Sequence, residues 1–127
     1  MVIDIHTHIL PKNLPDLEKK FGYGGWIRLD HNPNGTANMI KDGEQFRVVK
    51  CNCWDPVARL DDCQESGVSL QVISTIPVMF SYWAQPKHTY LLSRLLNDDI
   101  ANVVQNNPKR FFGLGTIPMQ DEKLAVK

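Results

Sequence analysis

The chain has 127 residues, which is enough for one ordinary domain with its own hydrophobic core. Hydrophobic residues make up 43% and charged residues 22%, a balance typical of soluble globular proteins. Lys plus Arg equal Asp plus Glu at 14 each, so there is no electrostatic reason to expect binding to nucleic acid or to an anionic membrane. No apolar run approaches the roughly 18 residues that cross a bilayer.

The first residues and the cysteines both predict a cytosolic protein. The chain opens with Met-Val-Ile-Asp-Ile-His, which has no basic segment ahead of an apolar stretch and predicts neither a signal peptide nor a transit peptide. The cysteines Cys51, Cys53 and Cys63 are odd in number, which predicts reduced thiols. They lack the Cys-x-x-Cys spacing of a zinc knuckle, so we expect buried or half-buried thiols.

Regular structure is expected to begin with a buried strand over residues 2–6, because this run is apolar and β-branched. The prolines that follow end it. Further along, the Asp42-Gly43 pair separates two strand-like runs, which is a strong hairpin signal. We therefore predict a small antiparallel β insertion at about residues 25–50. Its strand-like runs are residues 26–29, 38–41 and 44–49.

Helices and strands alternate after the insertion. Asp55 and Pro56 are typical of a helix start, and Gly67 of a helix end. The further expected elements are a strand at 68–76, a helix from 86 or 87 to 106, a strand at 111–117 and a helix opened by Asp121. This α/β order predicts parallel strands, which fit either a doubly wound sheet or a (β/α)8 TIM barrel. A barrel needs ~250 residues, so the chain would be its N-terminal part, about three βα units.

The pair His6 and His8 is the strongest chemical signal in the sequence. In a strand, residues i and i+2 project to the same side, so both imidazoles should point together. The end of a barrel strand is the catalytic end, and two imidazoles supply half of a tetrahedral zinc site. Asp4, two residues earlier, is expected on the same face as an acceptor for an imidazole N–H. The competing interpretation is a chance His-x-His pair on an exposed strand, which binds no metal.

The remaining candidate residues have simpler interpretations. His31 and His88 have no ligand at a paired spacing and are expected at the surface. Arg47 is either an ordinary surface arginine or, because Phe46 and Val48 flank it, a partly buried clamp for a carboxylate. Four aromatic residues are expected in the core or in a pocket wall: Trp54, Phe80, Tyr82 and Trp83. Motifs for a serine nucleophile, a phosphate-binding loop or His-Glu-x-x-His are absent.

Several segments together resemble the aminocarboxymuconate semialdehyde decarboxylase family of the amidohydrolase superfamily. They are residues 3–11 (IDIHTHILP), 21–26 (FGYGGW), 46–49 (FRVV), 52–56 (NCWDP), 77–84 (PVMFSYWA) and 113–119 (GLGTIPM). The resemblance runs from the first residue to the last. It implies a zinc-dependent carboxy-lyase in the kynurenine pathway of tryptophan catabolism, which limits the formation of quinolinate and NAD. It also implies a small dicarboxylate semialdehyde as substrate and a cytosolic homodimer.

The resemblance assigns roles to three residues of this sequence. His6 and His8 match the family's first two zinc ligands. Arg47 matches an arginine that binds a substrate carboxylate, which reverses the surface interpretation of that residue. The family's other zinc ligands, a His and an Asp, and its catalytic His lie on later strands and have no counterpart here.

We therefore expect residues 1–127 to form a truncated amidohydrolase-type barrel domain, with no catalytic residue of its own. Such a chain should bind zinc weakly, associate through its open strands and be inactive alone. Two alternatives remain at this point. One is another amidohydrolase-type metal-dependent lyase or hydrolase, and the other is a non-catalytic truncated product that at most binds partners.

Overall fold

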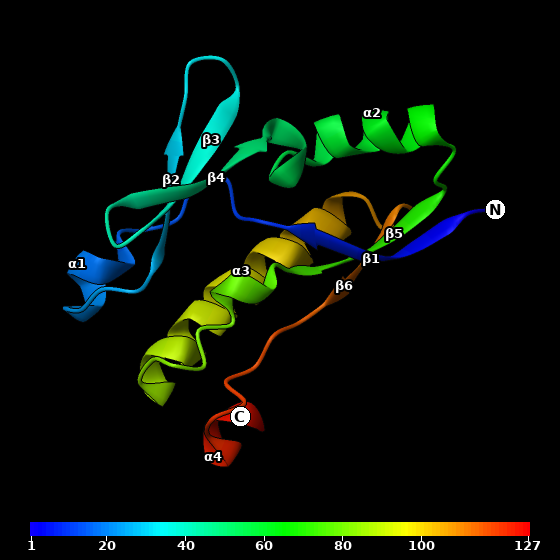
Figure 1. The fold of residues 1–127 in the computed structure, drawn as a ribbon. Helices are drawn as coiled ribbons and strands as arrows, with labels where there is room; N and C mark the ends of the chain where they lie inside the picture. The colour runs from blue at the N-terminus through cyan, green and yellow to red at the C-terminus, as the bar shows by residue number, and fades with distance from the viewer.

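The computed structural model describes all 127 residues, which form two sheets and the helices around them (Figure 1). The parallel sheet has the order β1 (Ile3–Ile9), β5 (Leu70–Thr75) and β6 (Phe111–Leu114). The antiparallel sheet has the order β2 (Ile27–His31), β3 (Thr36–Lys41) and β4 (Glu44–Lys50). The helices are α1 (Leu17–Phe21), α2 (Pro56–Ser66), α3 (Pro86–Asn106) and α4 (Glu122–Ala125), and single 3₁₀ turns cover Cys51–Cys53 and Pro77–Met79.

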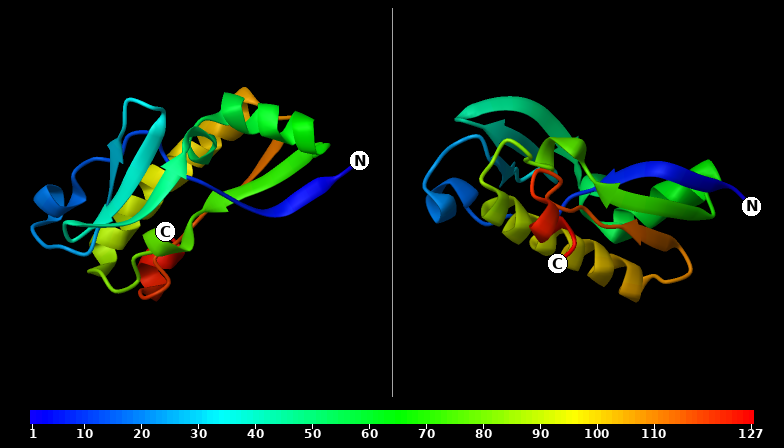
Figure 2. Two further views of the ribbon diagram at one scale, coloured as in Figure 1. Left: turned by 45° about the horizontal axis from the view of Figure 1, so that its top comes forward. Right: turned by 90° about the horizontal axis from the view of Figure 1, so that it is seen from below.

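Both long helices cover the same face of the parallel sheet. Ile73 of β5 is fully buried, together with Phe111 of β6 and Ile100 of α3. Leu60 of α2 packs against this same cluster, and the views from two sides agree with this arrangement (Figure 2). A doubly wound sheet has helices on both faces, whereas a barrel has all of them outside. The structure therefore confirms the prediction of a partial (β/α)8 barrel.

The other face of the parallel sheet has no helix over it. Phe112 and Leu114 of β6 point to this side, because their neighbour Phe111 is buried under the helices. Their exposed fractions are 57% and 55%. In a closed barrel this face is the interior and is filled by side chains of the other strands. The three parallel strands are therefore one arc of a barrel wall.

The helix boundaries follow the capping residues that the sequence predicted. The Asp55 carboxylate accepts a hydrogen bond of 2.9 Å from the N–H of Val57, and Pro56 is the first residue of α2. Gly67 ends this helix in the left-handed conformation, with φ of 73°. Helix α3 also has its predicted bounds. None of the helices combines the length and apolar character needed to cross a membrane.

The antiparallel sheet confirms the predicted insertion at about residues 25–50. Asp42 and Gly43 both have positive φ, 50° and 80°, as a type I′ turn between β3 and β4 requires. Ala37 and Met39 of β3 are fully buried and belong to one core cluster with Leu92 of α3. The insertion therefore packs on the first half of α3 and not on the parallel sheet.

Some local features differ from the prediction. Helix α1 was not expected, although Asp16 caps the N–H of Lys19 at 2.9 Å and Gly22 ends the helix with φ of 85°. Strand β1 runs on to Ile9, and β6 already ends at Leu114. All three cysteines are free thiols, as predicted, with Cys63 buried and Cys53 half-buried. Cys51 is exposed, contrary to the expectation, because it lies in the 3₁₀ turn that precedes α2.

Candidate metal site on the parallel sheet

His6 and His8 project together from the last half of β1. Their ring centroids are 5.2 Å apart and the rings meet edge to face, with an interplanar angle of 89°. His8 is half-buried and His6 is exposed. His8 pairs in register with Ser74 of β5, which pairs in turn with Leu114 of β6. The two imidazoles therefore lie on the open face, where a barrel interior would be.

His8 is held by one hydrogen bond. Its Nδ1 lies 3.0 Å from the hydroxyl oxygen of Ser74, and the same hydroxyl lies 3.4 Å from the carbonyl oxygen of Thr7. No hydrogen bond engages Nε2 of His8 or either ring nitrogen of His6. Each imidazole thus has at least one ring nitrogen that is free to bind a metal ion.

The two histidines fit a metal ion as part of a donor set. Neutral imidazole nitrogen is a preferred ligand of zinc, and a stable site has three or four protein ligands. No group of three or more His, Cys, Asp or Glu residues gathers in this chain. The chain thus offers two possible imidazole ligands, and the expectation that they bind zinc together with ligands from later strands stays a prediction.

Asp4 does not take the position expected of it beside the imidazoles. Asp4 pairs with Gln71 but Thr7 pairs with Ile73, so β1 has three steps where β5 has two. This bulge reverses the alternation of side chains between Asp4 and His6. The Asp4 carboxylate accepts from the Gln71 amide at 3.2 Å and from the backbone N–H of His6 at 3.1 Å. Asp4 therefore supports the strand from the helix-covered side and contacts neither imidazole ring.

The sequence did not single out Arg59 of α2, which holds β1 from the helix-covered face. Its side chain is only 7% exposed and donates to the Thr7 hydroxyl at 2.8 Å and to the Gln71 amide oxygen at 3.2 Å. It also donates to the carbonyl oxygen of His8. Burial lowers the pKa of the Arg59 guanidinium, and no carboxylate is hydrogen-bonded to it. The available signal was its position four residues before buried Cys63, on the inner face of α2.

Arg47 lies on β4, opposite Met39 in the antiparallel sheet. Its side chain is exposed and forms neither a hydrogen bond nor an ion pair. Arg47 and Gln45 pair with consecutive residues of β3, so Phe46 between them is the extra residue of a second bulge. The guanidinium is thus free to bind an anion, and its assignment to a substrate carboxylate stays a prediction.

The other two histidines behave differently from each other. His31 is exposed, as predicted, and its ring contacts the edge of Trp54 with centroids 4.8 Å apart. His88 is half-buried, so the surface prediction is wrong for it. Its ring stacks on Phe21 at 4.3 Å, and its Nδ1 lies 2.8 Å from the Tyr23 hydroxyl. Burial, followed by the charge of Lys87, lowers the pKa of His88. His88 thereby joins the start of α3 to the segment before β2.

The four aromatic residues expected in the core or in a pocket wall divide into two groups. Trp54 is buried in the core, as predicted, and Phe80 is half-buried. Tyr82 and Trp83 are substantially exposed, so they do not belong to the core, and a place in a pocket wall stays a prediction for them. Trp83 still packs on Trp26, with ring centroids 5.0 Å apart. The Trp26–Trp83 contact thus joins the loop before α3 to the start of the insertion.

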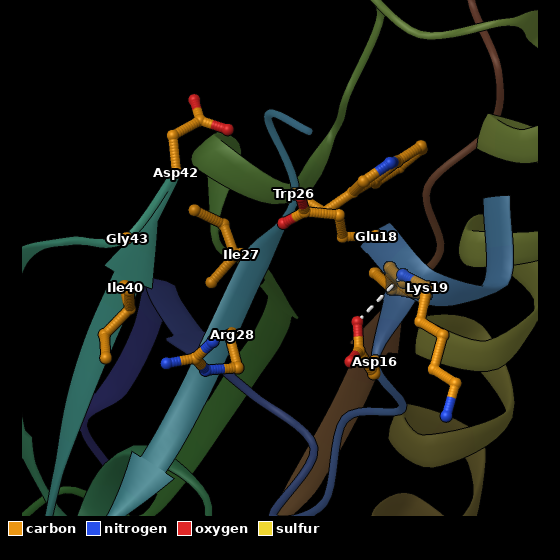
Figure 3. A pocket seen from close by; sticks show the side chains of 10 residues that line it. Asp16, Glu18, Lys19, Trp26, Ile27, Arg28, Ile40, Asp42 and Gly43 are labelled. Atoms are coloured by element: carbon orange, nitrogen blue, oxygen red, sulfur yellow. Dashed lines mark hydrogen bonds between the residues drawn. The ribbon is translucent and has the colours of Figure 1, made fainter. Parts of the chain in front are cut away.

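A hollow of about 320 Å³ lies between α1 and the antiparallel sheet (Figure 3). Three of the five charged residues that line it are already engaged. Asp16 caps α1, Asp42 accepts from the N–H of Gly25 at 2.6 Å, and Arg28 is paired with Asp30 at 2.8 Å. This leaves few groups to fix a ligand, and His6 and His8 remain the better candidate site.

Comparison with curated proteins identifies relatives of the whole chain. Over 125 residues it is 55% identical to a Dictyostelium discoideum protein named 2-amino-3-carboxymuconate-6-semialdehyde decarboxylase, covering 98% of this chain and 35% of that protein. A Caenorhabditis elegans protein of the same name is 50% identical over 125 residues, with 98% and 31% covered. The chain is thus similar in sequence to these decarboxylases over nearly its whole length. It spans about a third of the length of the curated relatives it matches.

Solved structures share the fold at low sequence identity. IDCase of Metarhizium anisopliae in apo form has a TM-score of 0.74 and 15% identity, over 98% of this chain and 37% of that chain. A dihydroxybenzoic acid decarboxylase from a Polaromonas species, solved with manganese and the inhibitor 2-nitroresorcinol, has a TM-score of 0.65 and 20% identity, over 98% and 32%. No protein-family profile matches the chain. The structural likeness concerns the fold alone, and the chain spans about a third of each of these structures.

Proposed function

We propose that this chain is the metal-binding part of a decarboxylase that acts on 2-amino-3-carboxymuconate-6-semialdehyde. The observation that carries the proposal is the 55% identity with a relative of that name across 98% of the chain. The two imidazoles on the open face of β1 support it, because a barrel holds its chemistry at the ends of its strands. The substrate belongs to the kynurenine route of tryptophan breakdown. The complete enzyme acts in the cytosol as a homodimer.

His6 and His8 are the residues that would hold the metal in this proposal, and zinc is the metal. Zinc suits a site that contains two imidazoles. A manganese ion in a structurally similar decarboxylase supports a metal in general. When bound, zinc supplies Lewis-acid polarisation and lowers the pKa of a coordinated water. The chain itself contributes the two imidazole ligands and the hydrogen bond between Ser74 and His8, which orients the ring of His8.

Arg47 would bind a carboxylate of the substrate. Its guanidinium is exposed, unpaired and able to form two parallel hydrogen bonds with a carboxylate. A fixed carboxylate positions the carbon skeleton, and such positioning lowers the barrier of the reaction. Arg47 thus contributes orientation and not proton transfer, and no residue of this chain takes the role of acid or base.

The proposal is tested with the full reading frame that contains this chain. Metal-depleted protein is given zinc, and loss of the substrate's ultraviolet absorbance is followed together with carbon dioxide release. We expect zinc-dependent turnover, with zinc content lost in His6→Ala and His8→Ala. Arg47→Ala should raise KM at unchanged zinc content, and zinc loss in that variant would favour a structural role.

The matched control is Arg94→Ala, which removes an exposed arginine on α3. It should leave KM and zinc content unchanged. The 127-residue chain alone should bind zinc weakly and show no turnover, because it supplies only two ligands. Turnover by this chain alone would contradict the proposal that later strands complete the site, and failure of the full protein on this substrate would contradict the substrate assignment.

A further inference from the structure

We infer that Ser74 is a positioning residue. It fixes His8 in the tautomer with the hydrogen on Nδ1, which leaves the lone pair of Nε2 free to bind a metal ion. The inference rests on the proposed function for the metal, but the tautomer is a property of this chain alone. Ser74 lies directly opposite His8 in the parallel register, and its hydroxyl oxygen is 3.0 Å from Nδ1. Its neighbours on β5, Ile73 and Thr75, are both buried, so the hydroxyl is presented from a fixed strand.

The direction of the hydrogen bond follows from the second partner of Ser74. Its hydroxyl also lies 3.4 Å from the carbonyl oxygen of Thr7, which can only accept. A hydroxyl has one proton, and when this proton points to Thr7 the oxygen must accept from His8. Nδ1 of His8 then carries the hydrogen and Nε2 keeps its lone pair. No other hydrogen bond reaches this ring, so nothing besides Ser74 holds the proton on Nδ1.

His6 provides an internal comparison, because no residue holds its ring in the same way. Its ring nitrogens have no hydrogen-bond partner, and its side chain is exposed. A metal ligand whose other nitrogen is hydrogen-bonded is fixed in tautomer and orientation and is more basic. His8 should therefore be the first ligand to engage a metal ion, and His6 should follow by rotating into place.

The tautomer is measured by ¹⁵N NMR of the 127-residue chain at a pH where both imidazoles are neutral. We expect His8 to carry its hydrogen on Nδ1, whereas His6 shows a mixture. Ser74→Ala should abolish this difference, and Ser74→Thr, which keeps a hydroxyl, should preserve it. Ser69→Ala is the matched control, because the Ser69 hydroxyl accepts from the N–H of Val2 at the opposite end of the same strands. A wild-type His8 with its hydrogen on Nε2, or a tautomer unchanged in Ser74→Ala, would overturn the inference.

Zinc titration of the same samples separates this inference from the proposed function. We expect Ser74→Ala to weaken zinc binding at His8 by about tenfold, with Ser69→Ala and Ser74→Thr close to wild type. Equal zinc affinity in the wild type and Ser74→Ala would overturn the positioning role and leave the metal site standing. If zinc leaves the ¹⁵N signals of both imidazoles unchanged while the tautomer still depends on Ser74, the metal assignment alone is overturned.

Discussion

The two faces of the parallel sheet use the same strands for opposite purposes. Toward α2 and α3, alternate residues such as Ile73 and Phe111 are almost fully buried and hold the layers together. Toward the open side, Phe112 and Leu114 remain more than half exposed, and the two histidines point the same way. Stability therefore comes from one face, while the proposed chemistry and the unfinished barrel interior belong to the other.

The sharpest test of this comparison replaces each of two adjacent phenylalanines by alanine in separate variants. Phe111→Ala removes a fully buried ring and should lower the free energy of unfolding by about 3–5 kcal/mol. Phe112→Ala removes the next residue, which faces the open side, and should cost far less. The unfolding midpoints in urea of the two variants, at a protein concentration low enough to keep the chain monomeric, measure the difference. Similar losses would show that the open face is also packed in solution.

The second test removes the cation that ties the covered face to the histidine strand. Arg59→Met keeps the length of the side chain but breaks its hydrogen bonds to Thr7, Gln71 and the His8 carbonyl. Leaving these partners unsatisfied should cost about 1–3 kcal/mol in the urea experiment. Arg94→Met, at an exposed position of α3, is the control and should be neutral. A neutral Arg59→Met would mean that water replaces the guanidinium.

The third test concerns the open face itself. Three parallel strands with exposed apolar side chains and open edges favour association, so the isolated chain should form assemblies that grow with concentration. Replacing Phe112 and Leu114 by Ser should shift sedimentation toward the monomer without changing the unfolding midpoint. A wild-type chain that stays monomeric at high concentration would argue against the open face as the route of association.

Local sequence signals predicted most of this architecture, and long-range pairing accounts for the rest. The Asp42-Gly43 turn and the caps at Asp55 and Gly67 depend on residues close in sequence, and all three have their predicted structure. The bulge that turns Asp4 away from the histidines depends on pairing with β5, which lies far along the chain. No local pattern encodes it.

The candidate site divides in the same way. The i, i+2 spacing of His6 and His8 predicted that both imidazoles lie on one side of β1, and their rings are indeed in contact there. Ser74 could not be singled out, because its importance comes only from its register opposite His8. Arg59 was equally hidden, since a charged residue on a helix is usually solvated unless its partners are known.

The smallest expected effect is a pH dependence of the free energy of unfolding, caused by His88 at the start of α3. The pKa of His88 is lowered in the folded protein, because burial disfavours its charged form. The unfolded chain therefore binds more protons between the two pKa values, and stability rises with pH in that range. The contribution is complete above the ordinary histidine pKa of about 6.5 and is lost as the pH falls through the lowered value.

His88→Gln should remove this part of the pH dependence, as seen by comparing urea midpoints at about pH 8 and about pH 5, on either side of that ordinary pKa. Tyr23→Phe removes the hydroxyl 2.8 Å from Nδ1 but keeps the ring, so it should retain most of the dependence if burial is the cause. An equal loss in both variants would assign the shift to the hydrogen bond instead.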